Sequence, residues 1–304
     1  MSKFSKDELV DLLLREFVPV AFDQFYQRQR NDAEGEFYRK IASQGPRKNF
    51  KRTTQGCYVA DAAGNLYGFN NNFGTERLLE VTRKALKEFN AAKIKIAPTK
   101  KLKRGTSDPK FDRTIAPGAV VVQVNSKVLY PAGTEFANEH ARIFGTAISR
   151  DNLWVLPKEL EDLSKGKLSQ SLAFRIARFH LVDNTRGEPE MWGKDDIRQL
   201  EMEVLPGNKI GGSVYLKTKS GKRGYQAKLM GFFEIDDATG ALKRFDLVAL
   251  GEHWGKSRWV ANAAKGKTPL AITFRLAKKN DIAFTVPPQG TKGWMKPYMS
   301  PVSD

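Results

Sequence analysis

In the first part of the chain, helical spacing alternates with short β-prone runs. A capping box at Ser5 and Glu8 opens an amphipathic helix, and a second capping box at Asn31 and Glu34 opens another. Between them, the apolar run at 18–22 is entered through Pro19 and predicts a short buried strand. The pattern therefore begins as helix, strand, helix.

A hairpin and a third helix complete this part. The β-prone runs Cys57–Ala60 and 65–69 are joined across the turn from Asp61 to Gly64. Thr75 then caps a helix that ends near Asn90, with its apolar residues on one side.

The chain after residue 115 is richer in strands. The runs 120–124 and 127–130 flank Asn125-Ser126, which predicts a two-residue hairpin turn. Pro157 marks the first turn of a short helix, and the spacing of apolar residues over 168–179 predicts a longer one. Alternating segments follow at 200–205, 213–218, 225–235, 242–250 and 270–276. They predict an antiparallel meander, open or closed into a barrel.

A basic stretch separates the two parts. Residues 93–113 hold eight Lys or Arg against two Asp, and Pro98, Gly105 and Pro109 interrupt any periodicity, which is typical of an exposed linker. We therefore predict an α+β chain. Its predicted parts are a small domain at 1–92, a basic linker at 93–114, a strand-rich domain at 115–290 and a tail at 291–304.

The small domain resembles the thioredoxin-like fold. In that family a strand pair with a Gly-containing turn, here Asp61-Ala-Ala-Gly64-Asn65-Leu66, precedes a C-terminal amphipathic helix. The family's Cys-x-x-Cys centre is missing, because 23–32 contains no cysteine, and 53–56 lacks the family's cis-proline. The resemblance thus implies a thioredoxin-like domain that has lost dithiol exchange. The strand-rich part resembles no family.

The net charge of +17 favours polyanions as partners, namely nucleic acid, an anionic membrane surface or acidic polysaccharide. Within the linker the cations are densest at Lys100, Lys101, Lys103 and Arg104. A second basic cluster is interleaved with aromatic residues that could stack on bases or sugars; its members are His253, Trp254, Lys256, Arg258 and Trp259. The alternatives are a solvated basic surface, and two tryptophans that close the end of a barrel.

Several classes of protein are disfavoured. No apolar run approaches the roughly 18 residues of a membrane span. The apolar segment 9–22 is interrupted by charges, so no export signal is visible and the default compartment is the cytoplasm. A single cysteine excludes an internal disulfide framework and an all-cysteine zinc site, and no cofactor or metal is predicted.

Cys57 is a candidate nucleophile. Arg47, Lys48, Lys51 and Arg52 precede it, and nearby cations favour a thiolate. The alternative is a small buried apolar side chain, which is the usual environment of a free cysteine.

A second candidate site is the helix exit 179–187. There His180 is a candidate base that Asp183 would orient, and Arg186 is a candidate anion ligand. The alternative is an ordinary helix exit with turn-forming Asn184 and Gly187. His140, His180 and His253 would suit a transition metal if they converged, although their sequence spacing does not show this.

Two glycine-containing segments fall short of a phosphate loop. The segment 251–257 is one residue short of the required spacing, and the one ending at Gly266-Lys267-Thr268 has Ala261 in place of the first glycine. We therefore predict a non-catalytic or degenerate thioredoxin-like protein with a strand-rich binding or scaffold domain. The alternatives are an enzyme that uses Cys57 or His180 and Asp183, and a polyanion-binding protein.

Overall fold

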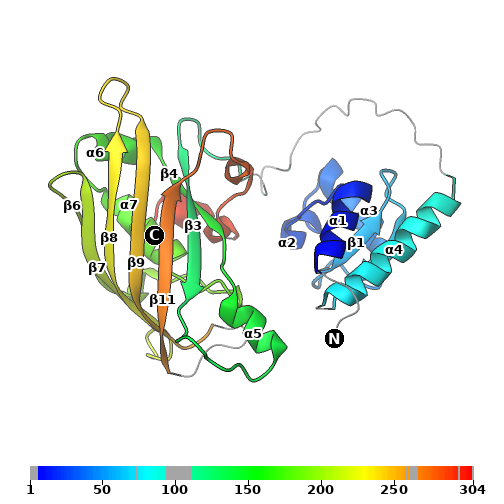
Figure 1. Cartoon of the computed structure of the whole chain (residues 1–304). Helices are drawn as coiled ribbons and strands as arrows, with labels where there is room; N and C mark the ends of the chain where they lie inside the picture. The colour runs from blue at the N-terminus through cyan, green and yellow to red at the C-terminus, as the bar shows by residue number, and fades with distance from the viewer. Residues whose placement is uncertain are drawn as a thin grey trace. The chain divides into compact units, whose positions relative to one another are not determined.

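The computed structural model describes residues 6–72, 74–93, 108, 111, 113–257, 259–260, 266–293 and 295–302. The chain divides into two compact units, Met1–Asp112 and Arg113–Asp304 (Figure 1). We describe each unit by itself. The division falls inside the predicted linker, of which 94–107 lies outside the described residues.

The N-terminal unit packs helices against one hairpin. Helix α4 (Thr75–Ala91) crosses strand β2 (Leu66–Asn70), which pairs antiparallel with β1 (Cys57–Ala60). Gly68 allows the close approach of α4, because a Cβ there would lie 2.9 Å from the Val81 side chain. The other helices of this unit are α1 (Lys6–Glu16), α2 (Gln24–Gln27) and α3 (Ala33–Ser43).

The hairpin turn is built by one side chain. The Asp61 carboxylate accepts hydrogen bonds from the backbone N–H groups of Ala63 and Asn65, each at 2.9 Å. Gly64 has a φ of 84°, a left-handed conformation that favours glycine. This part of the sequence pattern therefore predicted the turn correctly.

Two expectations for this unit differ from the structure. Residues 18–22 are not a buried strand but an irregular segment, in which Val18 is 88% exposed. Pro19 cannot donate to a strand ladder, and among the described residues of this unit β1 and β2 pair only with each other. The cap of α3 is Asp32, not Asn31, since the Asp32 carboxylate accepts from the Gly35 N–H at 3.1 Å.

The C-terminal unit is built on a curled antiparallel sheet in the order β4-β3-β11-β9-β8-β7-β6. This confirms the predicted α+β class and the strand-rich second part. The strands are β3 (Val120–Val128), β4 (Asp151–Val155), β6 (Ile197–Leu205), β7 (Lys209–Lys217), β8 (Gly224–Ile235), β9 (Leu242–Trp254) and β11 (Lys267–Leu276). Two short strands, β5 (Gly187–Glu188) and β10 (Trp259–Val260), pair separately.

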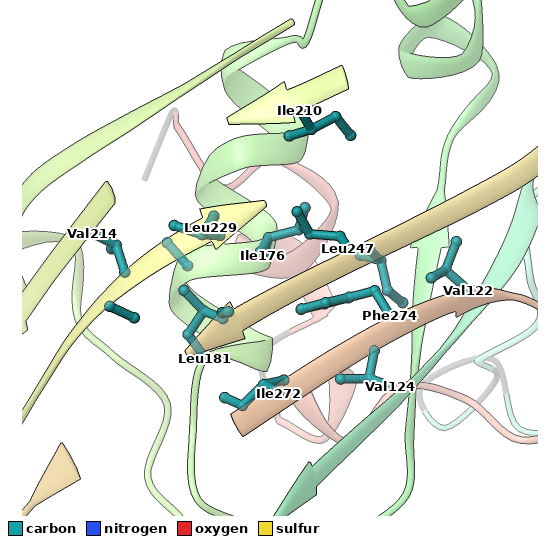
Figure 2. Close-up of a cluster of buried hydrophobic side chains, with 14 of the residues drawn as sticks. Val122, Val124, Ile176, Leu181, Ile210, Val214, Leu229, Leu247, Ile272 and Phe274 are labelled. Carbon is teal, nitrogen blue, oxygen red and sulfur yellow. The ribbon is translucent and has the colours of Figure 1, made fainter. Parts of the chain in front are cut away.

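One face of the sheet packs on a helix to form the main core. Helix α7 (Gln170–Arg175) continues into the π-helical turn η1 (Ile176–His180), and both lie on the concave side of the sheet (Figure 1). Figure 2 shows Ile176 and Leu181 among inward-facing residues of the strands, such as Leu229, Leu247 and Phe274. Burial of these alternating apolar side chains is the main driving force for this unit.

The remaining elements of this unit are short. They are α5 (Glu139–Thr146), α6 (Pro157–Ser164), η2 (Lys194–Asp196), η3 (Ile282–Thr285), η4 (Gln289–Thr291) and α8 (Met295–Met299). Pro157 begins α6, as predicted. None of the helices in the described ranges has both the length and the apolar character that a membrane-crossing segment needs.

Two expectations for this unit differ from the structure, and a third is confirmed with a shift of its bounds. Asn125-Ser126 is not a turn, because β3 continues through it and pairs with β11. Ser126 bonds to Ser149, its Oγ lying 2.6 Å from the Ser149 Oγ, so its polar group is satisfied inside the fold. The helix predicted over 168–179 is present; it begins at Gln170 and ends as a π-helical turn at His180. The predicted tail contains α8, whose Tyr298 is fully buried.

Candidate functional site

Two sequence segments that had seemed independent are neighbours in the C-terminal unit. Strand β5 begins at Gly187, the end of the helix exit, and β10 begins at Trp259, the last residue of the aromatic-basic cluster. They pair antiparallel, with Val260 opposite Gly187 and Trp259 opposite Glu188. This pairing closes a small pocket, which we call the Arg223 pocket, lined by Asp183, Pro189, Arg223, His253, Gly255, Lys256, Ser257 and Val260.

Asp183 is buried and ionised at one wall of the pocket. Its carboxylate accepts from the Thr185 N–H at 3.1 Å, the Thr185 hydroxyl at 2.6 Å and the Arg186 Nε at 2.9 Å. Burial alone would raise the pKa of Asp183, but the Arg186 charge and these hydrogen bonds outweigh it and lower the pKa. Asp183 and Arg186 therefore form a locally neutral, satisfied pair.

His253 faces this pair from strand β9. It is only 6% exposed, and among the described residues it has no hydrogen-bond partner. Burial lowers the pKa of His253 to about 4, and the positive charges of Arg186 and Arg223 add to the effect against the opposing Asp183. The imidazole is thus neutral at ordinary pH, with ring nitrogens that the described fold leaves unused.

Arg223 supplies the pocket's buried cation. Its guanidinium stacks 3.9 Å from the centre of the Trp192 ring and donates to the Glu190 carbonyl oxygen at 2.5 Å. Burial lowers the pKa of Arg223 to about 10, partly offset by nearby carboxylates, so it stays charged at neutral pH. A guanidinium has five N–H donors, and only this one hydrogen bond is made within the described residues.

The last wall comes from the turn after β9. Gly255 has a φ of 77°, and a Cβ there would collide with the Lys222 carbonyl oxygen, so the turn requires glycine. The turn brings Lys256 and Ser257 to the pocket, and the Ser257 hydroxyl accepts from the Glu190 N–H at 3.2 Å. The pocket's free volume of about 10 Å³ is close to that of one water-sized group.

His180 does not belong to this pocket, and Asp183 does not orient it. Its Nδ1 lies 3.0 Å from an Asp151 oxygen, and its Nε2 lies 3.0 Å from the Tyr298 hydroxyl. Burial raises the pKa of Tyr298, so this hydroxyl keeps its proton. Both ring nitrogens are occupied inside the core, which gives His180 a structural role.

The aromatic-basic cluster is divided between two faces of the sheet. His253 points to the pocket, whereas the neighbouring Trp254 packs near Tyr215 and donates to the Gly221 carbonyl oxygen at 3.2 Å. Alternation along β9 forces this division. Arg258 lies outside the described residues, and of Trp259 only the strand position is described.

The other predicted residues are placed as follows. Cys57 is exposed at the start of β1, so the alternative of a buried apolar side chain is wrong. Lys100, Lys101, Lys103 and Arg104 lie outside the described residues. In the part of the chain that the structure describes, no three His, Cys, Asp or Glu side chains converge as metal ligands.

Two residues of the pocket were not singled out by the sequence. Arg223 lies in the turn between β7 and β8, where its charge resembles that of the solvated lysines nearby. Ser257 stands in the segment 251–257, which fails as a phosphate loop. Its Lys and Ser residues nevertheless line one pocket with Asp183 and Arg223, which lie far away in the sequence.

The geometry of these side chains is therefore the basis on which a function can be assigned. The charged and polar groups of the Arg223 pocket come from the helix exit, the turn between β7 and β8, strand β9 and the turn after β9. No protein family model, no curated protein and no solved structure matches the chain.

Proposed function

We propose that the strand-rich unit is a binding module for an anionic group, which it holds in the Arg223 pocket. The observation that carries this proposal is that the His253 imidazole and the Arg223 guanidinium line one pocket, where the His253 ring nitrogens make no hydrogen bond to the described part of the chain. An imidazole nitrogen that faces a pocket without a protein partner can donate a hydrogen bond to, or accept one from, a group that enters the pocket. A ligand oxygen that both side chains contact would satisfy them.

The charges around the pocket favour an anion over a cation. The lining carries Arg223 and Lys256 against Asp183, and Asp183 is already neutralised by Arg186. A ligand anion would accept charge-assisted hydrogen bonds from Arg223, which are shorter and stronger than neutral ones. Neutral His253 and Ser257 can each donate one further hydrogen bond.

The size of the pocket limits how the ligand binds. About 10 Å³ accommodates one oxygen atom and not a whole phosphate. The ligand should therefore insert a single terminal oxygen of a phosphate, sulfate or carboxylate group, while the rest of the molecule stays at the surface near the exposed Lys256.

A hydrolase built on Ser257, His253 and Asp183 is less well supported. Such a triad requires the acid to bond the base and the base to bond the nucleophile. Here the Asp183 oxygens bond Thr185 and Arg186, and the Ser257 hydroxyl bonds the Glu190 N–H. A binding role requires none of the missing contacts.

For the N-terminal unit we propose a thioredoxin-like, non-catalytic role. The support is the order of hairpin β1–β2 followed by the amphipathic helix α4. The chain has one cysteine, so a dithiol centre cannot form within it.

The proposal is tested by calorimetric titration with inorganic sulfate at constant ionic strength, with chloride as the balancing ion. Arg223→Lys keeps the charge but loses the planar donor fork, so we expect affinity to fall about 10-fold to 100-fold, since hydrogen bonds to charged groups contribute about 1.5–3 kcal/mol. Lys256→Ala should weaken binding about twofold to fivefold, because it is exposed and such charges contribute about 0.2–1 kcal/mol.

Lys222→Ala is the matched control. Lys222 precedes Arg223 in the same turn and is exposed, but it does not line the pocket. We expect its sulfate affinity to equal that of the unchanged protein. Equal affinities across all three variants, or no sulfate binding beyond the effect of chloride, would contradict the proposal.

A further inference from the structure

The N-terminal unit carries a second basic surface that is independent of the Arg223 pocket. The loop between α3 and β1 holds Arg47, Lys48, Lys51 and Arg52, and no Asp or Glu occurs anywhere from Gln44 to Ala60. Lys48, Lys51 and Arg52 are exposed. Within the described residues none of the four forms an ion pair, in contrast to Arg30, which pairs with Asp32 and Glu34.

The loop is anchored at its C-terminal end by a buried threonine. The N–H and the hydroxyl of Thr54 both bond the side-chain oxygen of Gln24 in α2, each at 3.0 Å. The Thr54 carbonyl oxygen accepts from the Tyr58 hydroxyl at 2.6 Å. The basic residues are therefore presented by a backbone that is already ordered.

The middle of the loop is held from the inside. Arg28 of the α2 C-cap donates to the carbonyl oxygens of Phe50 and Arg52, and the Asn49 side chain accepts from the Lys51 N–H at 3.0 Å. The two Arg28 bonds occupy backbone acceptors that would otherwise repel an approaching anion. The side chains of Lys48, Lys51 and Arg52 remain on the solvent side.

We propose that this loop, the 47–52 loop, binds the phosphate backbone of a nucleic acid. Closely spaced Lys and Arg on an ordered loop neutralise successive phosphates, which is the main source of affinity for nucleic acids. The exposed Asn49, Thr53 and Gln55 beside them can donate to sugar and phosphate oxygens. An anionic membrane is a poorer fit, because the loop has no exposed large apolar side chain to insert.

The first test measures binding of the full chain to a fluorescent single-stranded oligonucleotide by anisotropy over a range of salt concentrations. The variant Lys48→Ala/Lys51→Ala/Arg52→Ala removes three cations. Each phosphate contact contributes about −0.7 to the slope of log K against log salt on single strands, so the slope should become shallower by about 2. Affinity at low salt should fall by about tenfold or more.

A matched control is available on helix α4. Arg77→Ala/Lys84→Ala/Lys87→Ala also removes one Arg and two Lys, all exposed in the same unit, and it should leave the slope unchanged. Equal effects of the two triple variants would overturn the proposal in favour of a generic basic surface. The proposal for the 47–52 loop would also fail if the slope changed only when Lys100, Lys101, Lys103 and Arg104 were neutralised.

A second test locates the ligand without altering the loop. Cys57 is the chain's one cysteine, is exposed and lies five positions after Arg52, so it can carry a thiol-linked photo-crosslinker. Crosslinking to the oligonucleotide should exceed several-fold that from a Cys57→Ser/Lys87→Cys variant labelled on α4. Equal or reversed yields would overturn the proposal. Arg223→Lys should change neither result, which separates this proposal from the anion pocket.

Discussion

At the scale of single residues, His253 offers the most direct test of the pocket's electrostatics. Its pKa is lowered by burial to about 4 in the folded protein, against about 6.5 in the unfolded chain. Above pH 6.5 the His253 side chain is neutral in both the folded and the unfolded protein, so it does not change the free energy of unfolding there. As pH falls from 6.5 to 4, only the unfolded state binds the proton, so stability is lost.

We expect the wild-type protein to lose about 3 kcal/mol of unfolding free energy through His253 over that interval, from 1.36 kcal/mol per pH unit. The His253→Gln variant lacks this titration and shares every other group. The stability advantage of the wild type over the variant should therefore shrink by that amount between pH 7.5 and 4, measured by urea unfolding of the C-terminal unit. A pH-independent difference would show that His253 is not buried as the structure has it.

The sequence identified Asp183, Arg186 and His253 as chemically interesting, but it could not show which of them meet. Asp183 bonds Arg186 and His180 bonds Asp151, so the base–acid pair expected from proximity along the chain is replaced by two separate pairs. Residue spacing constrains contacts within one turn of a helix. Contacts between β9 and the helix exit depend on the sheet, which local spacing does not encode.

At the scale of elements, alternation predicted strands well where one face is buried and the other exposed. Strands β8 and β9 keep the period of two along most of their length, and the predicted ranges fall within the observed ones. The prediction failed at Asn125-Ser126, because two polar residues in a row are typical of a turn. The hydrogen bonds from Ser126 to Ser149, which allow this pair inside β3, cannot be seen in the sequence. The prediction failed at 18–22 because an apolar run indicates burial only if another element covers it.

Asp32 shows how a single cap organises an element. Its carboxylate accepts from the Gly35 N–H, from Arg30 Nε at 2.7 Å and from the Asp108 N–H at 2.8 Å. Asp32→Ala should destabilise the N-terminal unit by about 1–2 kcal/mol, the usual cost of losing a helix cap. Asp32→Asn should cost less because its amide oxygen still accepts, and the exposed Glu36→Ala in the same turn serves as the control. Chemical denaturation that gave equal losses for Asp32→Ala and Glu36→Ala would contradict this role.

At the scale of the whole molecule, the charge of +17 indicates a binding surface only where the structure holds the cations in place. Many are solvated or paired, as Lys158 and Lys165 are with Glu161 on α6. The cations of the 47–52 loop and of the Arg223 pocket differ from these. Hydrogen bonds fix the backbone of the loop, and a hydrogen bond holds the guanidinium of Arg223. Composition predicted a polyanion partner, but it could not distinguish ordered cations from solvated ones.

The two units should also behave as separate cooperative structures. The buried clusters of the sheet, its helix and Tyr298 all lie within residues 113–304, and Leu79, Tyr38 and Ala42 are core residues of the N-terminal unit. A protein comprising residues 113–304 should therefore unfold in one transition and bind sulfate within about twofold of the full chain, while losing the steep salt dependence of oligonucleotide binding. Calorimetry of the full chain should resolve two transitions, of which the Asp32→Ala change lowers only one. A fragment that failed to unfold cooperatively, or an Asp32→Ala effect spread over both transitions, would mean that the units depend on each other for stability.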